Sequence, residues 1–194
     1  MAESLTRLVA EIRACRICEV ELEPRPVLHV TKGARILVAS QAPGLRVHLS
    51  GQSFDDTSGD RLRAWMGVTR NEFYDDRRVA LAGMAFCFPG YDAGGSDRPP
   101  PPICATHWRT RLMASLPNIE LILLAGSYAQ IWHLGNAAKS NMTETVRAWR
   151  DYRPRHIPLP HPSWRNNGWL KQNPWFEREL LPVLRRRVRR LLSS

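Results

Sequence analysis

Four cysteines are the residues whose spacing points most directly to chemistry. Cys15 and Cys18 form a C-x-x-C pair, whereas Cys87 and Cys104 bracket a long loop that contains four consecutive prolines. Four thiolates suit a tetrahedral zinc ion or an iron–sulfur cluster. Zinc sites usually consist of two tight pairs, so the wide second pair favours a cluster. Four ordinary buried cysteines, or a thioredoxin-like redox pair at C-x-x-C, are the alternatives.

A second set of polar residues lies in loops that follow the strands expected from the sequence. The three loops are Gln41–Thr57, Cys87–Ile103 and His161–Gln172. Each is more polar than a connecting turn needs to be. In open α/β sheets, ligands bind outside the carboxyl ends of the strands. The sequence therefore predicts a ligand site where these loops meet.

The elements that must position these loops alternate between helix and strand. Short apolar runs predict buried strands at Ala34–Ser40, Val79–Phe86, Ile119–Ala125 and His156–Pro160. Helices are expected at Ser4–Ala14, from Ser58 (as N-cap) to Trp65, at His107–Ser115, from Ser127, at Thr143–Tyr152, and at about 174–192 with Asn173 as cap. This alternation indicates an α/β protein with a mostly parallel sheet and helices on both faces.

Two of the loops carry motifs that resemble those of the uracil-DNA glycosylase superfamily. Ser40–Gly44, followed by Gly51–Phe54, is similar to the first motif, and His161–Ser163, followed by Asn166, is similar to the second. The cysteine layout resembles that of the 4Fe-4S members, families 4 and 5. The resemblance covers nearly the whole chain. It implies one domain over residues 1–194, a three-layer α/β/α sandwich with a four-stranded parallel central sheet.

The resemblance also implies roles for residues of these loops. A glycosylase flips its target base out of the duplex and into a pocket. Phe54 would supply the apolar face on which the base stacks, and its polar neighbours argue against deep burial. His161 would donate a hydrogen bond to uracil O2, where negative charge develops as the bond breaks. The other substrate-binding residues are Gln41, Ala42, Pro43, Gly44, Gly83, Ser163, Arg165 and Asn166.

The first motif departs from the family where a general base is expected. Family 4 carries Glu at the position of Gln41, and other members carry Asp at the position of Ala42. Neither an amide nor a methyl group can accept a proton from water. The nearest candidates are His48 and the two consecutive aspartates, Asp55 and Asp56. Because an aspartate before a helix usually caps it, Asp55 and His48 are the preferred catalytic candidates.

Two further departures concern selection of the base. Gly44 stands where stricter members have a tyrosine that excludes the thymine methyl group. The strand expected at Val79–Phe86 lacks the asparagine that reads the pyrimidine edge, so the backbone at Gly83 is expected to read it. Both departures favour a broader range of deaminated bases than uracil alone.

The charge of the chain fits a nucleic-acid partner. Lys and Arg number 28 against 18 Asp and Glu, which gives a net charge of +10, and such a basic balance is typical of nucleic-acid binding. No apolar run is long enough to span a membrane, and the N-terminus lacks the pattern of a secretory signal. We therefore expect a cytoplasmic, nucleoid-associated protein, with no membrane association and no obligate protein partner evident.

Together these features predict a DNA glycosylase that hydrolyses the N-glycosidic bond of uracil, and of other deaminated bases, in base excision repair. Its partner would be DNA containing such bases, and its cofactor a structural 4Fe-4S cluster on the four cysteines. One alternative is a non-catalytic or covalently trapping protein that binds damaged or single-stranded DNA on the same scaffold. Another is a zinc protein of unrelated function.

Overall fold

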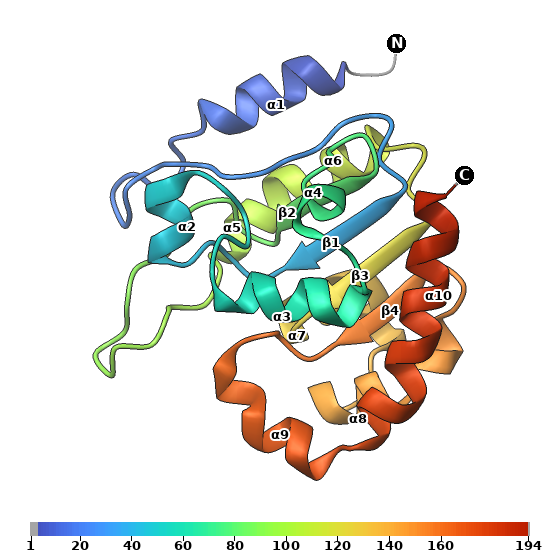
Figure 1. Ribbon diagram of the computed structural model, residues 1–194. Coiled ribbons are helices and arrows are strands. Elements are labelled where there is room, and N and C mark those ends of the chain that lie inside the picture. The colour runs from blue at the N-terminus through green and yellow to red at the C-terminus, as the bar shows by residue number, and fades with distance from the viewer. Residues whose placement is uncertain (1–3, 194) are drawn as a thin grey trace.

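A four-stranded parallel sheet forms the centre of the computed structural model, which describes residues 4–193 (Figure 1). The strands are β1 (Ile36–Ser40), β2 (Val79–Gly83), β3 (Leu121–Ala125) and β4 (His156–Leu159). Their order in the sheet is β2-β1-β3-β4, and every neighbouring pair is parallel. The register pairs Ser40 with Gly83, so the carboxyl ends of β1 and β2 lie side by side.

Apart from Ser40 at the end of β1 and His156 at the start of β4, the strands lack polar side chains, because both faces of the sheet are covered. Alternate side chains of a strand point to opposite faces. Ile36 and Val38 of β1 accordingly join one core with helices α3 (Thr57–Met66) and α10 (Leu181–Leu192). Their neighbours along the strand, such as Leu37, join a second core on the other face.

The second core packs against α1 (Leu5–Arg13), α6 (Thr110–Ala114) and α7 (Ser127–Leu134). The sheet therefore lies between two layers of helices. This arrangement confirms the three-layer α/β/α sandwich with a four-stranded parallel sheet that the sequence predicts.

The remaining helical elements are short. They are α2 (Leu45–Ser50), α4 (Arg70–Phe73), α5 (Pro102–Cys104), α8 (Met142–Arg147) and α9 (Asn167–Gln172), π-helical turns at Ala105–Arg109 and Phe176–Leu180, and 3₁₀ turns at Gly135–Ala137, Trp149–Tyr152 and Trp164–Asn166. Within residues 4–193, no helix combines the length and the apolar character that crossing a bilayer would require.

Several expected element boundaries were wrong. The segments expected to be loops after β1 and β4 contain α2 and α9. The N-cap of α3 is Asp56 instead of Ser58, because the Asp56 carboxylate accepts a hydrogen bond from the Gly59 amide at 2.9 Å. Strand β2 ends at Gly83, three residues before Phe86.

Asn173 also differs from its expected role as a helix cap. Its side-chain oxygen accepts a hydrogen bond from the Trp175 indole at 3.0 Å, and its amide nitrogen donates to the Trp169 carbonyl oxygen at 2.9 Å. The π-helical turn that follows Asn173 covers Phe176–Leu180. It gives way to α10 near Pro182, which has no backbone N–H to donate.

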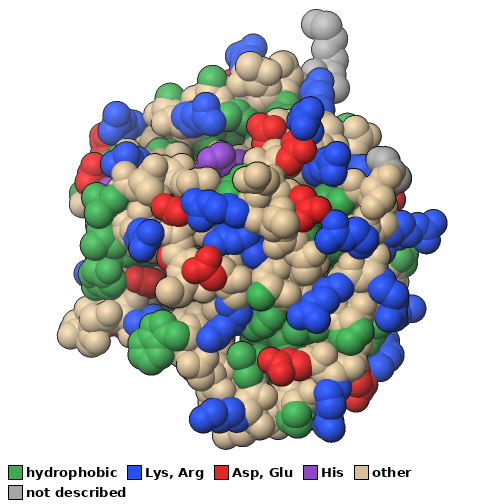
Figure 2. All heavy atoms as spheres, in the orientation of Figure 1, with side chains coloured by type: hydrophobic (Ala, Val, Ile, Leu, Met, Phe, Trp, Pro, Cys, Tyr) green, Lys and Arg blue, Asp and Glu red, His purple; other side chains and the backbone are tan. Residues whose placement is uncertain are grey.

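The arginines of α10 tie this helix to the rest of the fold as well as facing solvent. Arg185 donates to the Ala64 carbonyl oxygen at 3.1 Å, and Arg189 donates to the Glu72 carboxylate at 2.7 Å and to the Gly67 carbonyl oxygen at 3.0 Å. Figure 2 shows other Lys and Arg side chains distributed over this face of the molecule. The basic character of the chain is thus not confined to its last helix.

Candidate active site

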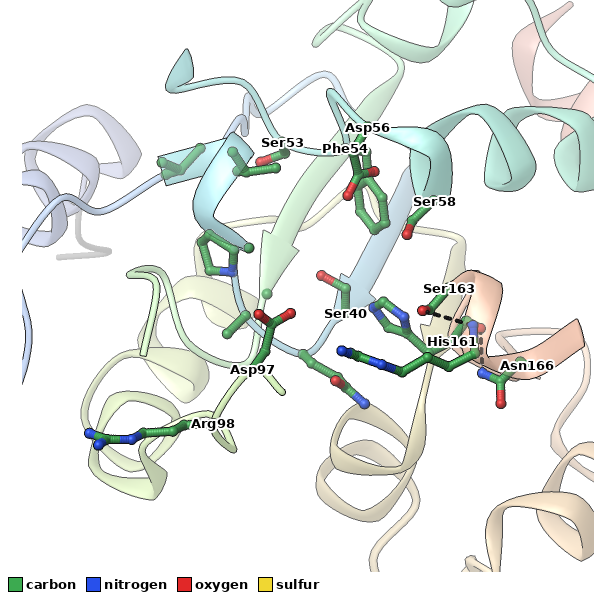
Figure 3. A pocket seen from close by; sticks show the side chains of 18 residues that line it. Ser40, Ser53, Phe54, Asp56, Ser58, Asp97, Arg98, His161, Ser163 and Asn166 are labelled. Atoms are coloured by element: carbon green, nitrogen blue, oxygen red, sulfur yellow. Dashed lines mark hydrogen bonds between the residues drawn. The ribbon is translucent and has the colours of Figure 1, made fainter. Parts of the chain in front are cut away.

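One cavity of about 260 Å³ opens at the carboxyl end of the sheet (Figure 3). The loops after β1, β2 and β4 all contribute to its lining. Of the residues expected from the sequence to bind substrate or act in catalysis, those that line it are Gln41, Ala42, Pro43, Gly44, Phe54, Gly83, His161, Ser163, Arg165 and Asn166. Segments more than 100 residues apart in the sequence therefore form one hollow.

Phe54 is held in a strained backbone conformation that turns its ring to the cavity. Its φ is +58°, a left-handed value that is rare for a bulky residue and is often found at functional sites. The Phe54 carbonyl oxygen accepts hydrogen bonds from the Tyr74 hydroxyl at 3.0 Å and from the Arg63 guanidinium at 3.4 Å. A Cβ atom at Gly59 would lie 1.8 Å from that same oxygen. The turn thus depends on a glycine at position 59.

The side chain of Phe54 serves the core and the cavity at once. It is only 9% exposed, which corrects the expectation that its polar neighbours keep it from deep burial. Its ring packs edge-on against Phe73, with the ring centres 6.0 Å apart. Another part of the ring lines the cavity, where Figure 3 shows it directed inward. This packing fixes the ring as an apolar wall.

His161 lines the cavity as an uncharged imidazole. Burial lowers the pKa of His161 to about 4; the positive charge of Arg165 lowers it further, and the negative charge of Asp56 opposes the shift. The ring is therefore neutral at pH 7 and donates through one nitrogen only. The Asn166 side-chain amide donates to the His161 carbonyl oxygen at 2.6 Å.

Arg61 of α3 holds the loop that carries His161. Its guanidinium donates to the Ser163 carbonyl oxygen at 2.8 Å and to the Asn167 side-chain oxygen at 2.7 Å. The Ser163 hydroxyl oxygen in turn accepts from the Arg165 amide at 3.3 Å. These bonds connect the loop after β4 to the helix that begins next to Phe54.

Two glycines allow the strand ends to approach each other below the cavity. A Cβ atom at Gly126, where φ is +95°, would lie 3.0 Å from the Gln41 amide nitrogen and 3.4 Å from the His161 Cβ. A Cβ atom at Gly83, the last residue of β2, would lie 3.0 Å from the carbonyl oxygen of Gln41, which follows β1. Gly126 was not among the residues predicted for the site. Its position between a buried strand and a helix is the one feature of the sequence that marks it.

The structure does not bring His48 or Asp55 to the cavity lining. The Asp55 carboxylate pairs with Arg70 at 2.9 Å, and this hydrogen bond lowers the pKa of Asp55. His48 is 6% exposed, with its Nε2 3.3 Å from a Glu23 carboxylate oxygen. Consecutive side chains diverge at the strained turn, so Phe54 and Asp56 line the cavity and Asp55 does not. The catalytic roles expected of His48 and Asp55 stay predictions.

Cys15, Cys18, Cys87 and Cys104 line a second, smaller cavity of about 30 Å³. Burial raises the pKa of Cys87 to about 11 and that of Cys104 to about 12. Among the described residues, no group of three or more Cys, His, Asp or Glu side chains is arranged to hold a metal ion. The fold therefore gathers the four thiols around one space without setting them at ligand distances.

A comparison with known families agrees with this geometry. The model of the Uracil DNA glycosylase superfamily matches residues 29–185, most of the chain and both cavity motifs. The chain belongs to this superfamily. Membership supports DNA glycosylase activity. The match begins after Cys15 and Cys18, so it leaves the branch of the superfamily and the role of the cysteines open.

The cavity of this superfamily member is also lined by residues that were not predicted to belong to the site. They are Val27, Ser40, Val47, Ser53, Asp56, Ser58, Asp97 and Arg98. Asp56, one of the candidate bases in the loop after β1, both caps α3 and lines the cavity. Asp97 and Arg98 come from the proline-rich loop, which was expected to border the ligand site although none of its residues was singled out. Trp164, which is 66% exposed, directly precedes the lining residue Arg165.

Acid should destabilise this protein through its buried histidines. Burial lowers the pKa of His161 to about 4 and that of His133 to about 2, whereas an unfolded histidine titrates near ~6.5. Between these values the unfolded state binds more protons than the folded state, so the free energy of unfolding should decrease as the pH falls from about 6.5 toward 4. Urea unfolding at several pH values measures this slope. His161→Asn should make it shallower, and an unchanged slope would show that His161 is not a buried neutral group.

Proposed function

We propose that this protein excises uracil from DNA by hydrolysing the N-glycosidic bond. The observation that supports this most directly is the single cavity lined by Phe54, His161 and the first-motif residues 41–44. Such a cavity offers an apolar ring for stacking and a neutral donor for a base carbonyl. Both are needed to accept a base that has left the duplex.

The chemistry follows from how charge moves as the bond breaks. The bonding electron pair passes to the base, so negative charge develops on uracil O2, and positive charge develops on the sugar. The neutral imidazole of His161 donates a hydrogen bond to O2, and this bond strengthens as the charge grows. Phe54 stacks on the pyrimidine and keeps water from its face. The preset position of both side chains lowers the cost of organising the site during the reaction.

Other deaminated bases are further candidate substrates. Gly44 places no side chain over the cavity, and β2 provides no asparagine to read the pyrimidine edge. The Gly83 carbonyl oxygen already accepts from the buried Arg109 guanidinium at 3.1 Å. The choice among bases would therefore rely on backbone groups and on the shape of the cavity more than on a dedicated polar side chain.

The mouth of the cavity suits the DNA backbone and the bases next to the target. Ser163, Arg165 and Asn166 offer phosphate contacts, and the exposed Trp164 ring offers a surface on which a base can stack. With a net charge of +10, DNA binding should weaken steeply as salt is added. Association with the nucleoid in the cytoplasm is the expected consequence.

Cys15, Cys18, Cys87 and Cys104 are proposed as the ligands of a 4Fe-4S cluster. Four thiols around one cavity are a donor set that fits such a group. When bound, the cluster would supply a structural crosslink, since hydrolysis needs no electron transfer. The cysteines would then join the segment after α1 to both ends of the proline-rich loop, which begins near Cys87 and leads into α5.

Metal analysis of the protein purified without oxygen tests this assignment. We expect roughly four iron atoms and four sulfides per chain, and Cys104→Ser should lose them and lower the melting temperature. One bound zinc and no iron would contradict the cluster and favour the zinc site. Full metal content in Cys104→Ser would remove that residue from the ligand set.

A strand-cleavage assay tests the excision itself. A labelled oligonucleotide with one uracil is incubated with the protein, and alkali then breaks the strand at any abasic site. We expect breakage at the uracil and none at a thymine in the same position. Intact DNA at excess protein, despite binding, would contradict excision and favour a non-catalytic binder. A protein–DNA band that survives denaturation would instead indicate covalent trapping.

A further inference from the structure

The first motif lacks an acid, yet the reaction needs a group that orients water and stabilises the sugar cation. Gln41 and Ala42 end in an amide and a methyl group. We propose that Asp97, from the loop between β2 and α5, is the catalytic carboxylate. The inference rests on the proposed glycosylase function and adds a residue that neither motif contains.

Asp97 reaches the cavity on the side of the first motif. Its carboxylate Oδ2 lies 3.9 Å from the position that a Cβ atom would take at Gly44. Figure 3 shows the Asp97 carboxylate directed into the cavity, across from His161 and below Phe54. A carboxylate there occupies the space beside the turn from which an acid is missing.

A small hairpin within the segment that was expected to be a loop holds Asp97 in this position. Tyr91 and Asp97 form an antiparallel bridge, and the Arg98 amide donates to the Gly90 carbonyl oxygen at 2.9 Å. At the tip, one Asp92 carboxylate oxygen accepts from the amides of Gly94 and Ser96 at 2.9 and 2.8 Å. The backbone bridge therefore sets the direction of the Asp97 side chain.

Of the acidic side chains around Phe54, Asp97 is the one without a structural task. Asp55 is paired with Arg70, and one oxygen of Asp56 accepts the capping hydrogen bond from Gly59. Within residues 4–193, the Asp97 carboxylate makes no hydrogen bond or ion pair that would occupy it. It is exposed at the mouth of the cavity, where water can reach it.

The charges in the cavity suit a carboxylate that accepts a proton. Partial burial raises the pKa of Asp97; the negative charge of Asp56 adds to the shift, and the positive charge of Arg165 opposes it. Arg98 adjoins Asp97 at the mouth, and His161 is neutral. The carboxylate lines the cavity in which the sugar would become positive.

The step balances without any further reactant. The oxygen of a water molecule forms a bond to the anomeric carbon of the sugar, and the N-glycosidic bond breaks with its electron pair left on the base. The proton that the water loses passes to the Asp97 carboxylate and then to solvent. The base anion, held by His161, takes up a proton from solvent and leaves as the free base.

Asp97→Asn tests the assignment because it removes the charge and keeps the shape. Under single-turnover conditions we expect uracil release to slow by roughly 10²- to 10⁴-fold, with affinity for uracil-containing DNA changed only a few-fold. The wild-type rate should fall as acid protonates the carboxylate, and this decrease should be absent in Asp97→Asn. Asp92→Asn is the matched control on the same hairpin, since its amide oxygen can still accept from Gly94 and Ser96, and its rate should equal that of the wild type.

Asp56→Asn distinguishes the neighbouring carboxylate, because asparagine caps a helix as well as aspartate. We expect it to lose less activity than Asp97→Asn. If the wild type excises uracil and Asp97→Asn is equally fast, or if Asp56→Asn is the slower variant, the inference is wrong while the proposed function stands. If the wild type releases no base, the proposed function fails first.

Asp97→Glu tests the assignment if Asp97→Asn does not fold. We expect Asp97→Glu to retain partial activity, and its rate should decrease in acid as the wild-type rate does. A full rate without that decrease would overturn the assignment.

Discussion

Replacing His161 with alanine should slow uracil release by about 10²- to 10³-fold, the usual cost of removing one donor to a developing oxyanion. The reason lies in the neutral, buried imidazole, whose hydrogen bond to the base strengthens only as the bond breaks. Single-turnover release measures the rate, and fluorescence anisotropy measures affinity for the same DNA. The affinity should change little, because the lost interaction is weak in the ground state.

His107→Ala is the control for this substitution. His107 lies on the π-helical turn Ala105–Arg109 and is exposed, outside the cavity lining. Its removal should leave the rate of uracil release unchanged. If His161→Ala kept the wild-type rate, or lost affinity and rate in equal measure, His161 would not be the donor that stabilises the departing base.

Gly59→Ala should impair both activity and stability, although Gly59 does not line the cavity. The new methyl group would lie 1.8 Å from the Phe54 carbonyl oxygen, so the turn must move. The hydrogen bonds that Arg63 and Tyr74 make to that oxygen would be disturbed, and the Phe54 ring would shift with them. We expect an excision rate lower by about 10²-fold, as a misplacement of ~1 Å can cause, and a free energy of unfolding lower by about 1–3 kcal/mol.

Gly168→Ala is the matched control, because it adds the same methyl group at a position with free space around it. Gly168 lies in α9, its φ is not positive, and no other residue comes within 4 Å of the added atom. This variant should excise uracil at the wild-type rate and be as stable as the wild type or slightly more stable. Equal behaviour of the two variants in urea unfolding and single-turnover release would show that the turn at Phe54 does not depend on Gly59.

The sheet could be predicted from the sequence because its signal is local. Strands β1, β2 and β3 are short, mostly apolar runs that are buried on both faces. Helices α2 and α9 were not predicted, since six residues give too little periodicity. Helix α9 also begins at Asn167, which is held by Arg61 from a distant helix, and such tertiary contacts leave no local pattern.

The site could be predicted only as far as its motifs reach. The residues of the two glycosylase motifs meet at the cavity because both follow strands of one parallel sheet. The sequence put Asp55 next to Phe54 but did not reveal the left-handed turn that separates the two side chains. Asp97 and Gly126 lie in neither motif, and only the folded chain brings Asp97 close to Gly44 and Gly126 close to Gln41 and His161.

A crystal structure with uracil-containing DNA tests the central claim most directly. A fluorine on the 2′ carbon of the target sugar would destabilise the positive charge that develops on the neighbouring anomeric carbon. Cleavage would then be slow enough for the intact nucleotide to be observed. We expect an everted uracil stacked on the Phe54 ring, with its O2 within hydrogen-bond distance of the His161 imidazole. A uracil that remains stacked in the duplex, or one bound away from these two side chains, would contradict it.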